Sequence, residues 1–207
     1  MSGLEIAGLC ICIGDRDVVR AVDLHVEPGT CVGLVGESGS GKSLTALASV
    51  GLLPRAARVR AGRILLGGTE NVAPGRDGTA KVRGSGITMI FQSPRAALNP
   101  VLRVGHQVDR VLRRKGRGDD LRSRTGMGVL LISHDLSVVA ERCESISVMR
   151  QGAIVEAGAT RAVIRAPRHP FTAELIRDLA HSPESGGLPV RSPSAGPADD
   201  STREADE

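Results

Sequence analysis

Short apolar runs beside glycine or polar residues predict the strands of this chain. Residues 22–26 alternate between apolar and polar side chains, which predicts a strand with one buried face. Cys31–Val35 and Val129–Ile132 are continuous apolar runs, which are typical of parallel strands buried on both faces. Residues 64–66 and 87–91 predict two more short strands.

Apolar residues at helical spacing predict four helices among these strands. The helices are expected over residues 43–53, 104–112, 136–143 and 172–180. Pro54 ends the first helix, and Thr172 is the candidate N-cap of the last. Residues 146–155 predict a hairpin that turns at Gln151 and Gly152. Because strands alternate with helices, the sequence predicts an α/β fold of three layers.

The composition agrees with one folded domain. The chain has 207 residues, of which 41% are hydrophobic and 24% are charged, and this excludes a wholly disordered or fibrous protein. No run of about 18 apolar residues occurs, and the first residues lack the basic and apolar regions of a secretory signal. Residues 182–207 are rich in proline, serine, glycine and acidic residues, which predicts a disordered tail.

Three features of the composition narrow the possible functions. Phe91 and Phe171 are the only aromatic residues, which excludes a site that stacks a ligand on several rings. Basic residues cluster within 55–63 and 110–124, but no nucleic-acid-binding motif accompanies them, so no nucleic acid is expected as a partner. Zinc-ligand spacing is absent from the cysteines, which are expected to be buried, reduced thiols: Cys10, Cys12, Cys31 and Cys143.

One segment matches the phosphate-binding pattern G-x-x-x-x-G-K-[ST] at every position. Its glycines allow a tight turn in which main-chain N–H groups cradle phosphate oxygens, and the helix that follows adds its positive partial charge. Lys42 is expected to reach the β- and γ-phosphates, and the Ser43 hydroxyl to bind Mg²⁺. The phosphate-binding residues are expected to be Gly36, Glu37, Ser38, Gly39, Ser40, Gly41, Lys42 and Ser43.

Further motifs resemble the ATP-binding subunit of ABC transporters. Residues 90–94 read Ile-Phe-Gln-Ser-Pro and residues 98–100 read Leu-Asn-Pro, while residues 129–136 resemble the histidine switch of that family. Residues 168–172, Arg-His-Pro-Phe-Thr, resemble the C-terminal element of its oligopeptide, dipeptide and nickel importer branch. The resemblance implies a P-loop NTPase core with a mostly parallel sheet and an N-terminal antiparallel β part. It also implies ATP and Mg²⁺ as cofactors.

The same resemblance assigns roles to single residues. It makes Gln92 and His134 the candidate catalytic residues: Gln92 contacts Mg²⁺ and water and communicates with the membrane subunit, and His134 senses the γ-phosphate. Ser43 and Gln92 are the implied Mg²⁺ ligands. Ile13 stands where the family places an aromatic ring on adenine, so it is the expected adenine contact. His169 is expected to cap or pack the C-terminal element.

Two elements of the family are missing from the sequence. Between Gln92 and His134 there is no apolar strand that ends in Asp-Glu, the pair that in this family holds Mg²⁺ and polarises the attacking water. The Leu-Ser-Gly-Gly-Gln signature is also absent. We interpret these gaps as an internal deletion between about residues 117 and 121 that removes most of the helical subdomain. The strands that end at Gln92 and Ser133 are then expected either to pair directly or to leave the sheet split.

Three functions remain open at this point. The first is the ATP-binding subunit of a peptide (oligopeptide or dipeptide) importer that couples ATP binding and hydrolysis to transport. It is expected to be cytoplasmic and peripheral on the inner face of the cell membrane. Its expected partners are transmembrane permease subunits and another ATP-binding subunit, in a homo- or heterodimer. The second is a nucleotide-binding protein that does not hydrolyse ATP, either regulatory or the inactive half of a pair. The third is a non-functional remnant of a deletion.

In each case the same division of the chain is expected. Residues 1–165 form the ATP-binding domain, residues 166–181 the importer-type C-terminal element, and residues 182–207 the tail. Whether the chain alone is an ATPase stays open, because the Asp-Glu pair and the signature are absent.

Overall fold

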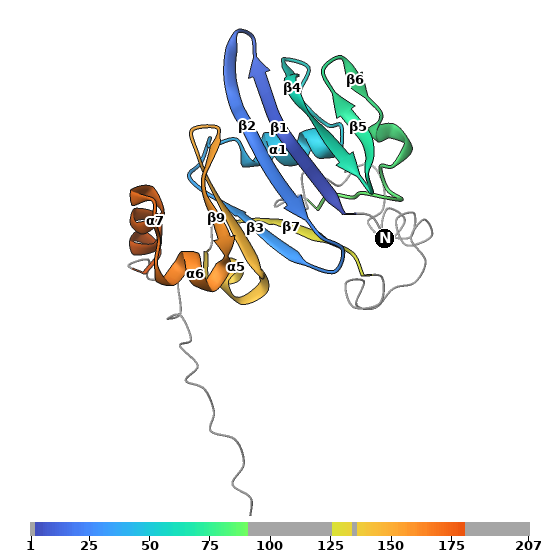
Figure 1. Ribbon diagram of the computed structural model, residues 1–207. Coiled ribbons are helices and arrows are strands. Elements are labelled where there is room, and N and C mark those ends of the chain that lie inside the picture. The colour runs from blue at the N-terminus through green and yellow to red at the C-terminus, as the bar shows by residue number, and fades with distance from the viewer. Residues whose placement is uncertain (1–2, 91–125, 134–135, 181–207) are drawn as a thin grey trace, which may run out of the picture.

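The computed structural model describes residues 3–90, 126–133 and 136–180, which form two sheets and several short helices (Figure 1). The first sheet is antiparallel throughout, with the strand order β2-β1-β4-β5-β6. Its strands are β1 (Leu4–Ile13), β2 (Arg16–Val26), β4 (Ala57–Leu66), β5 (Thr69–Ala73) and β6 (Arg76–Asp77).

The second sheet has four strands in the order β7-β3-β8-β9. They are β3 (Cys31–Val35), β7 (Val129–Ile132), β8 (Ser145–Arg150) and β9 (Ala153–Ala159). β3 pairs in parallel with both β7 and β8, and β9 pairs antiparallel with β8. The predicted strands over Cys31–Val35 and Val129–Ile132 and the predicted hairpin are therefore confirmed. All five residues of β3 are buried, as expected for a central strand.

Helices lie on both sides of the second sheet. They are α1 (Lys42–Ser49), α5 (Leu136–Arg142), α6 (Thr160–Arg165) and α7 (Pro170–Ala180), with a 3₁₀ turn, η1 (Thr79–Lys81), after β6. None of the helices in the described ranges combines the length and the apolar character that a membrane span requires.

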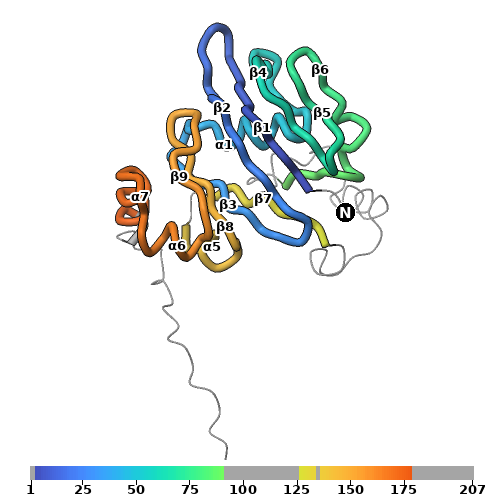
Figure 2. Tube along the Cα trace, in the orientation of Figure 1, coloured from blue at the N-terminus to red at the C-terminus, as the bar shows by residue number. Residues whose placement is uncertain are grey.

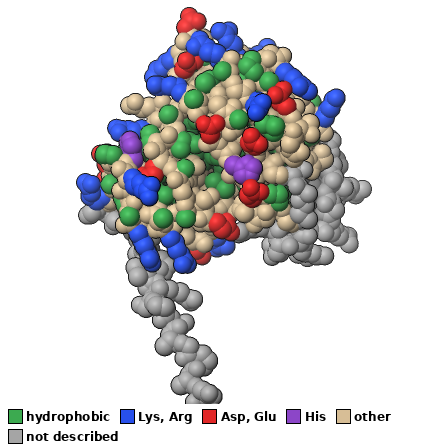
Figure 3. All heavy atoms as spheres, in the orientation of Figure 1, with side chains coloured by type: hydrophobic (Ala, Val, Ile, Leu, Met, Phe, Trp, Pro, Cys, Tyr) green, Lys and Arg blue, Asp and Glu red, His purple; other side chains and the backbone are tan. Residues whose placement is uncertain are grey.

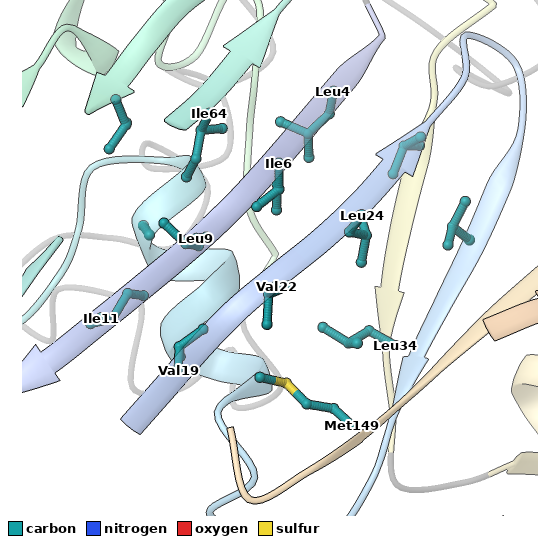
Figure 4. Close-up of a cluster of buried hydrophobic side chains, with 14 of the residues drawn as sticks. Leu4, Ile6, Leu9, Ile11, Val19, Val22, Leu24, Leu34, Ile64 and Met149 are labelled. Carbon is teal, nitrogen blue, oxygen red and sulfur yellow. The ribbon is translucent and has the colours of Figure 1, made fainter. Parts of the chain in front are cut away.

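Two clusters of buried apolar side chains hold these elements together. The larger cluster joins the two sheets, because Leu34 of β3 and Met149 of β8 pack with residues of β1 and β2 such as Ile6 and Val22 (Figure 4). The second cluster lies between β3 and β8 and the helices α5, α6 and α7, and Phe171 belongs to it. β3 therefore contributes to both clusters, which fixes the segment that follows it.

The surface carries charges of both signs. On the face shown in Figure 3, lysine and arginine side chains are spread around the outline of the molecule, with aspartate and glutamate between them. Arg60 pairs with Asp17 at 3.0 Å, and Arg76 pairs with Glu70 at 3.2 Å. Cys12, Cys31 and Cys143 are buried as predicted, whereas Cys10 is only half-buried, and no disulfide joins these four residues.

Three predictions about secondary structure are wrong. In the described part of residues 87–91, only Ile87 takes part in β pairing, as an isolated bridge to Arg83. The first helix ends at Ser49 rather than at residue 53, because Gly51 adopts a left-handed conformation with φ of 63°. Thr172 is not an N-cap, since α7 already begins at Pro170.

Other predictions lie outside the described residues. They are the helix over 104–112, the tail over 182–207, and Phe91 and Gln92 at the end of the predicted strand over 87–91. The choice between direct pairing and a split sheet therefore stays a prediction.

Candidate functional site

The segment between β3 and α1 forms a tight loop that only glycine can build at two positions. Gly36 has φ of 149° and Gly41 has φ of 105°, conformations that L side chains rarely adopt. A Cβ on Gly36 would lie 2.0 Å from the carbonyl oxygen of Met149, and a Cβ on Gly41 would lie 2.8 Å from Met149 Cε. Strand β8 thus approaches the loop so closely that a methyl group has no room.

The ammonium group of Lys42 folds back across this loop. Its Nζ donates to the carbonyl oxygens of Gly36 at 2.7 Å and Glu37 at 2.6 Å, and to Ser40 Oγ at 3.2 Å. Partial burial lowers the pKa of Lys42 from its ordinary value, and the nearby carboxylate of Glu37 opposes this shift. The positive charge is therefore held over the loop by oxygen acceptors that an incoming anion can replace.

The loop is also anchored from two neighbouring strands. Ser40 is 2% exposed, and its carbonyl oxygen accepts a hydrogen bond from Gly152 N at 3.0 Å. The carbonyl oxygen of Gly152 in turn accepts from Arg20 N of β2 at 2.7 Å. The turn between β8 and β9 thus ties the loop to the first sheet. The sequence predicts Gly152 only as a turn residue, and no local signal indicates this contact.

The opposite side of the loop faces solvent. Glu37, Ser38 and Gly39 are exposed, and so is Ser43 in the first turn of α1. The helical hydrogen bonds of α1 start with Thr45 N, which donates to the carbonyl oxygen of Gly41 at 3.0 Å. A helix leaves its first N–H groups without partners inside the helix, and these groups and the helix dipole favour an anion. The loop and the start of α1 together can hold phosphate oxygens.

The parallel pairing of β3 with β7 brings a second predicted segment to the same edge of the sheet. Leu34 lies opposite Ile132, so the carboxyl ends of the two strands, followed by Gly36 and Ser133, are neighbours. His134 comes directly after Ser133 but lies outside the described residues, as does Gln92. The structure therefore brings together the eight residues of the loop but does not describe the two candidate catalytic residues.

The expected adenine contact lies at the end of β1. Ile13 pairs with Arg16 across the β1–β2 hairpin and is 40% exposed. Farther along β2, the carbonyl oxygen of Val18 lies 3.1 Å from the position of a Cβ on Gly41. The hairpin that carries Ile13 thus runs past the loop, with Ile13 next to the turn that joins β1 to β2.

A carboxylate on β9 organises the Arg-His-Pro-Phe-Thr element. Glu156 accepts hydrogen bonds from Arg168 N at 2.9 Å and His169 N at 3.0 Å. Partial burial raises the pKa of Glu156, but these N–H donors and the proximity of His169 outweigh it, so the pKa lies below its ordinary value. No sequence pattern indicates this role of Glu156, because its partners lie on another element.

His169 forms the N-terminal cap of α7. Its Nδ1 accepts a hydrogen bond from Phe171 N at 3.1 Å, and its carbonyl oxygen accepts from Thr172 N at 3.0 Å. Pro170 then occupies the first helical position, where its missing N–H costs nothing. The expectation that His169 caps the element is confirmed.

Comparisons with known proteins agree with these features. The model of the ABC transporter family matches residues 19–164. A putative peptide import ATP-binding protein of Brucella ovis is 32% identical, over 78% of this chain and 71% of its own length. A probable D,D-dipeptide transport ATP-binding protein of Escherichia coli is 30% identical, over 79% of this chain and 73% of its own. A dipeptide transport ATP-binding protein of Haemophilus influenzae is 28% identical, over 86% of this chain and 78% of its own length.

The lengths of these alignments differ from the length of the chain. They run over 241, 239 and 257 positions, each more than the 207 residues of this chain, although they cover at most 86% of it. The relatives therefore contain internal residues that have no counterpart here.

Solved structures show the same fold. An ATP-binding subunit of an ABC transporter superposes with a TM-score of 0.52 at 18% identity, over 86% of this chain and 99% of the other. A bacterial Atm1-family ABC exporter with ATP bound gives 0.57 at 16% identity, over 87% of this chain but only 42% of the exporter. The P-loop NTPase fold expected from the sequence is thus confirmed.

Proposed function

The chain belongs to the ABC transporter family as an ATP-binding subunit, and from this we propose that it serves a peptide importer. The relatives named for peptide and dipeptide transport support this substrate class. The Glu156-anchored element at Arg168 and His169 supports it as well, because the sequence of this element resembles the importer branch. ATP-binding subunits of importers work with transmembrane permease subunits. We therefore place the chain on the cytoplasmic face of the membrane, paired with a second ATP-binding subunit.

The observation that carries ATP binding, the activity on which the proposal rests, is the tight loop over which Lys42 folds. With ATP bound, the ammonium group exchanges its contacts to Gly36 and Glu37 for the β- and γ-phosphates. The main-chain N–H groups at the start of α1 hold the remaining phosphate oxygens. Ile13 contributes an apolar contact to adenine.

The donor set at Ser43 fits Mg²⁺. In proteins this ion is usually held by one or two side-chain oxygens together with substrate phosphates and water. The exposed hydroxyl of Ser43 at the start of α1 is such a ligand, and we propose Gln92 as the second. Within the described ranges no three His, Cys, Asp or Glu side chains gather as a separate metal site. When bound, Mg²⁺ neutralises charge on the phosphates, and His134 is the proposed sensor of the γ-phosphate.

A second candidate function is ATP binding without hydrolysis. It is favoured by alignments that are longer than the chain and by the lack of an Asp-Glu strand between Gln92 and His134. Without a carboxylate to position and polarise the attacking water, phosphoryl transfer loses its main electrostatic and positioning contributions. In this case the chain acts as a regulatory subunit or as the inactive half of a pair.

Phosphate release from ATP·Mg²⁺ separates the two candidates. The wild-type chain is compared with Lys42→Ala, and Lys81→Ala serves as the matched control because Lys81 is an exposed lysine on η1. Release at the Lys42→Ala level supports binding without hydrolysis. Release well above that level, retained in Lys81→Ala, shows that the chain hydrolyses ATP.

Co-sedimentation tests the importer assignment. Vesicles that hold the permease pair of a peptide importer are compared with vesicles of the same lipids that hold no protein. The proposal predicts that the chain sediments only with the permease vesicles. Equal sedimentation with both kinds of vesicle, or with neither, would contradict it.

A further inference from the structure

Two cysteines from distant parts of the chain meet in the core next to β3. Cys31 is the first residue of β3, and Cys143 directly follows α5. Their Sγ atoms lie 3.3 Å apart, and no disulfide joins them. The two residues are only 4% and 7% exposed. Two thiols separated by 112 positions in the sequence are therefore in contact inside the protein.

Hydrogen bonds and side-chain packing around the two cysteines hold this pair together. The N–H of Cys31 donates to Glu144 Oε2 at 2.6 Å, and the N–H of Glu144 donates to the carbonyl oxygen of Cys31 at 3.0 Å. Val139 of α5 packs against the same strand, since a Cβ on Gly33 would lie 2.3 Å from Val139 Cγ1. β3, β8 and α5 form one packed unit (Figure 2). The two sulfur atoms are thus fixed near each other from both sides.

We propose that Cys31 and Cys143 form a reversible disulfide when the protein meets a low-molecular-weight disulfide such as oxidised glutathione. The thiolate of one cysteine attacks a sulfur of the oxidant, breaks its S–S bond and forms a mixed disulfide, which releases one reduced thiol. The thiolate of the other cysteine then attacks the protein sulfur, forms the Sγ–Sγ bond and releases the second thiol. The two cysteines lose two electrons, and the two departing thiolates take up their two protons.

The required movement is small. A disulfide bond is about 2.05 Å long, so the sulfur atoms must approach each other by only about 1.2 Å. Because both residues are buried, the first exchange needs a transient opening at the end of α5. Short helix ends open locally at a much lower free energy than the whole domain. The reaction is therefore slow compared with exchange at a surface cysteine.

The bond has a structural consequence. It joins β3, the strand that leads into the loop over residues 36–43, to the residue directly after α5, the helix that follows His134 in the sequence. It also closes a long loop of the unfolded chain, which lowers the entropy of the unfolded state. The oxidised protein is expected to unfold at a temperature about 5–15 °C higher than the reduced protein.

Peptide mapping by mass spectrometry tests the proposal on the whole chain. The protein is incubated with oxidised glutathione or with dithiothreitol, blocked with an alkylating agent and digested without reduction. We expect a peptide that links Cys31 to Cys143 and lacks two hydrogen atoms, together with a higher melting temperature. Both changes should be reversed by dithiothreitol. These two readings need no variant, so they hold even if a substituted protein fails to fold.

Variants then show which cysteines react. Cys31→Ser and Cys143→Ser are each expected to abolish the linked peptide and the rise in melting temperature. Cys10→Ser is the matched control, because Cys10 lies on β1 in the other sheet and should leave both unchanged. A wild-type protein with no linked peptide overturns the proposal. So does one in which glutathione stays attached to Cys31 or Cys143, or in which the link involves Cys10 or Cys12.

Discussion

The main-chain N–H of Gly152 donates a hydrogen bond to the carbonyl oxygen of Ser40 at 3.0 Å. This bond connects the turn of the β8–β9 hairpin to the middle of the loop between β3 and α1. Gly152 has φ of 89°, and a Cβ there would lie 2.8 Å from the carbonyl oxygen of Val18. The shape of the loop between β3 and α1 therefore depends on a glycine more than 100 residues away in the sequence.

Gly152→Ala should weaken both the fold and nucleotide binding. The added methyl group meets main-chain atoms of β2 and strains a left-handed residue, so we expect a loss of about 2–4 kcal/mol in the free energy of unfolding. ATP affinity should fall several-fold, because the hydrogen bond to Ser40 is displaced. Urea unfolding and calorimetric titration measure the two effects.

Gly75→Ala is the control for this prediction. Gly75 also has a positive φ, 72°, but a Cβ there has open space around it. It should cost about 1 kcal/mol of stability from backbone strain alone and leave ATP affinity unchanged. If both variants changed ATP affinity equally, the contact between Gly152 and Ser40 would have no special role.

Glu156→Gln should destabilise the C-terminal element in a pH-dependent way. The carboxylate accepts two main-chain hydrogen bonds, and its folded pKa lies below the ordinary value of 4.5. Its contribution to stability is complete above that ordinary value and is lost as the pH falls through the lower folded pKa. At pH 7 we expect a loss of about 1 kcal/mol, since the site is partly solvated.

The difference in the free energy of unfolding between wild type and Glu156→Gln should therefore stay constant from pH 7 to about pH 5 and shrink below about pH 4. Thermal unfolding at a series of pH values measures it. Glu174→Gln, which changes an exposed glutamate of α7, should show no such difference. If the difference in stability between wild type and Glu156→Gln increased on acidification, the assigned role of the carboxylate would be contradicted.

Phe171→Ala should release α7 from the sheet. Phe171 is 2% exposed, belongs to the cluster between the second sheet and the helices, and lies under the guanidinium of Arg150, 4.6 Å from ring centroid to Cζ. Loss of a buried ring costs about 3–5 kcal/mol, and the cation–π contact is lost with it. Amide hydrogen exchange in α7 should accelerate more than exchange in β3. Leu52→Ala, at a residue that is 41% exposed, should leave amide exchange unchanged in both α7 and β3.

The parts of the fold that sequence predicts well are those with uninterrupted local patterns. Cys31–Val35 and Val129–Ile132 are continuous apolar runs, and both form parallel strands: all five residues of β3 are buried, whereas the four residues of β7 are half-buried. β1 lacks such a pattern, since Gly8 has φ of 57° and its register shifts between Ile6 and Leu9. Ile87, Met89 and Ile90 indicate a strand that the structure does not form, because Ile87 only bridges to Arg83.

In the candidate site, too, the residues of a local motif could be predicted and those that act through distant contacts could not. The tight loop over its eight residues could be predicted, because it is a continuous motif with a fixed backbone shape, and phosphate binding by these residues stays a prediction. The residues that support it could not, because Gly152 and Glu156 act through pairings set by β8 and β9. His169 could be assigned as a cap because it stands directly before Pro170 and α7.

The central claim is that the loop under Lys42 binds ATP, and isothermal titration calorimetry with ATP·Mg²⁺ tests it most directly. The wild-type chain and Lys81→Ala should bind with equal affinity. Lys42→Ala should bind at least about tenfold more weakly, because it loses a charge-assisted contact to the phosphates. The claim is contradicted if the wild-type chain shows no binding at millimolar ATP, or if Lys42→Ala binds ATP as tightly as the wild type does.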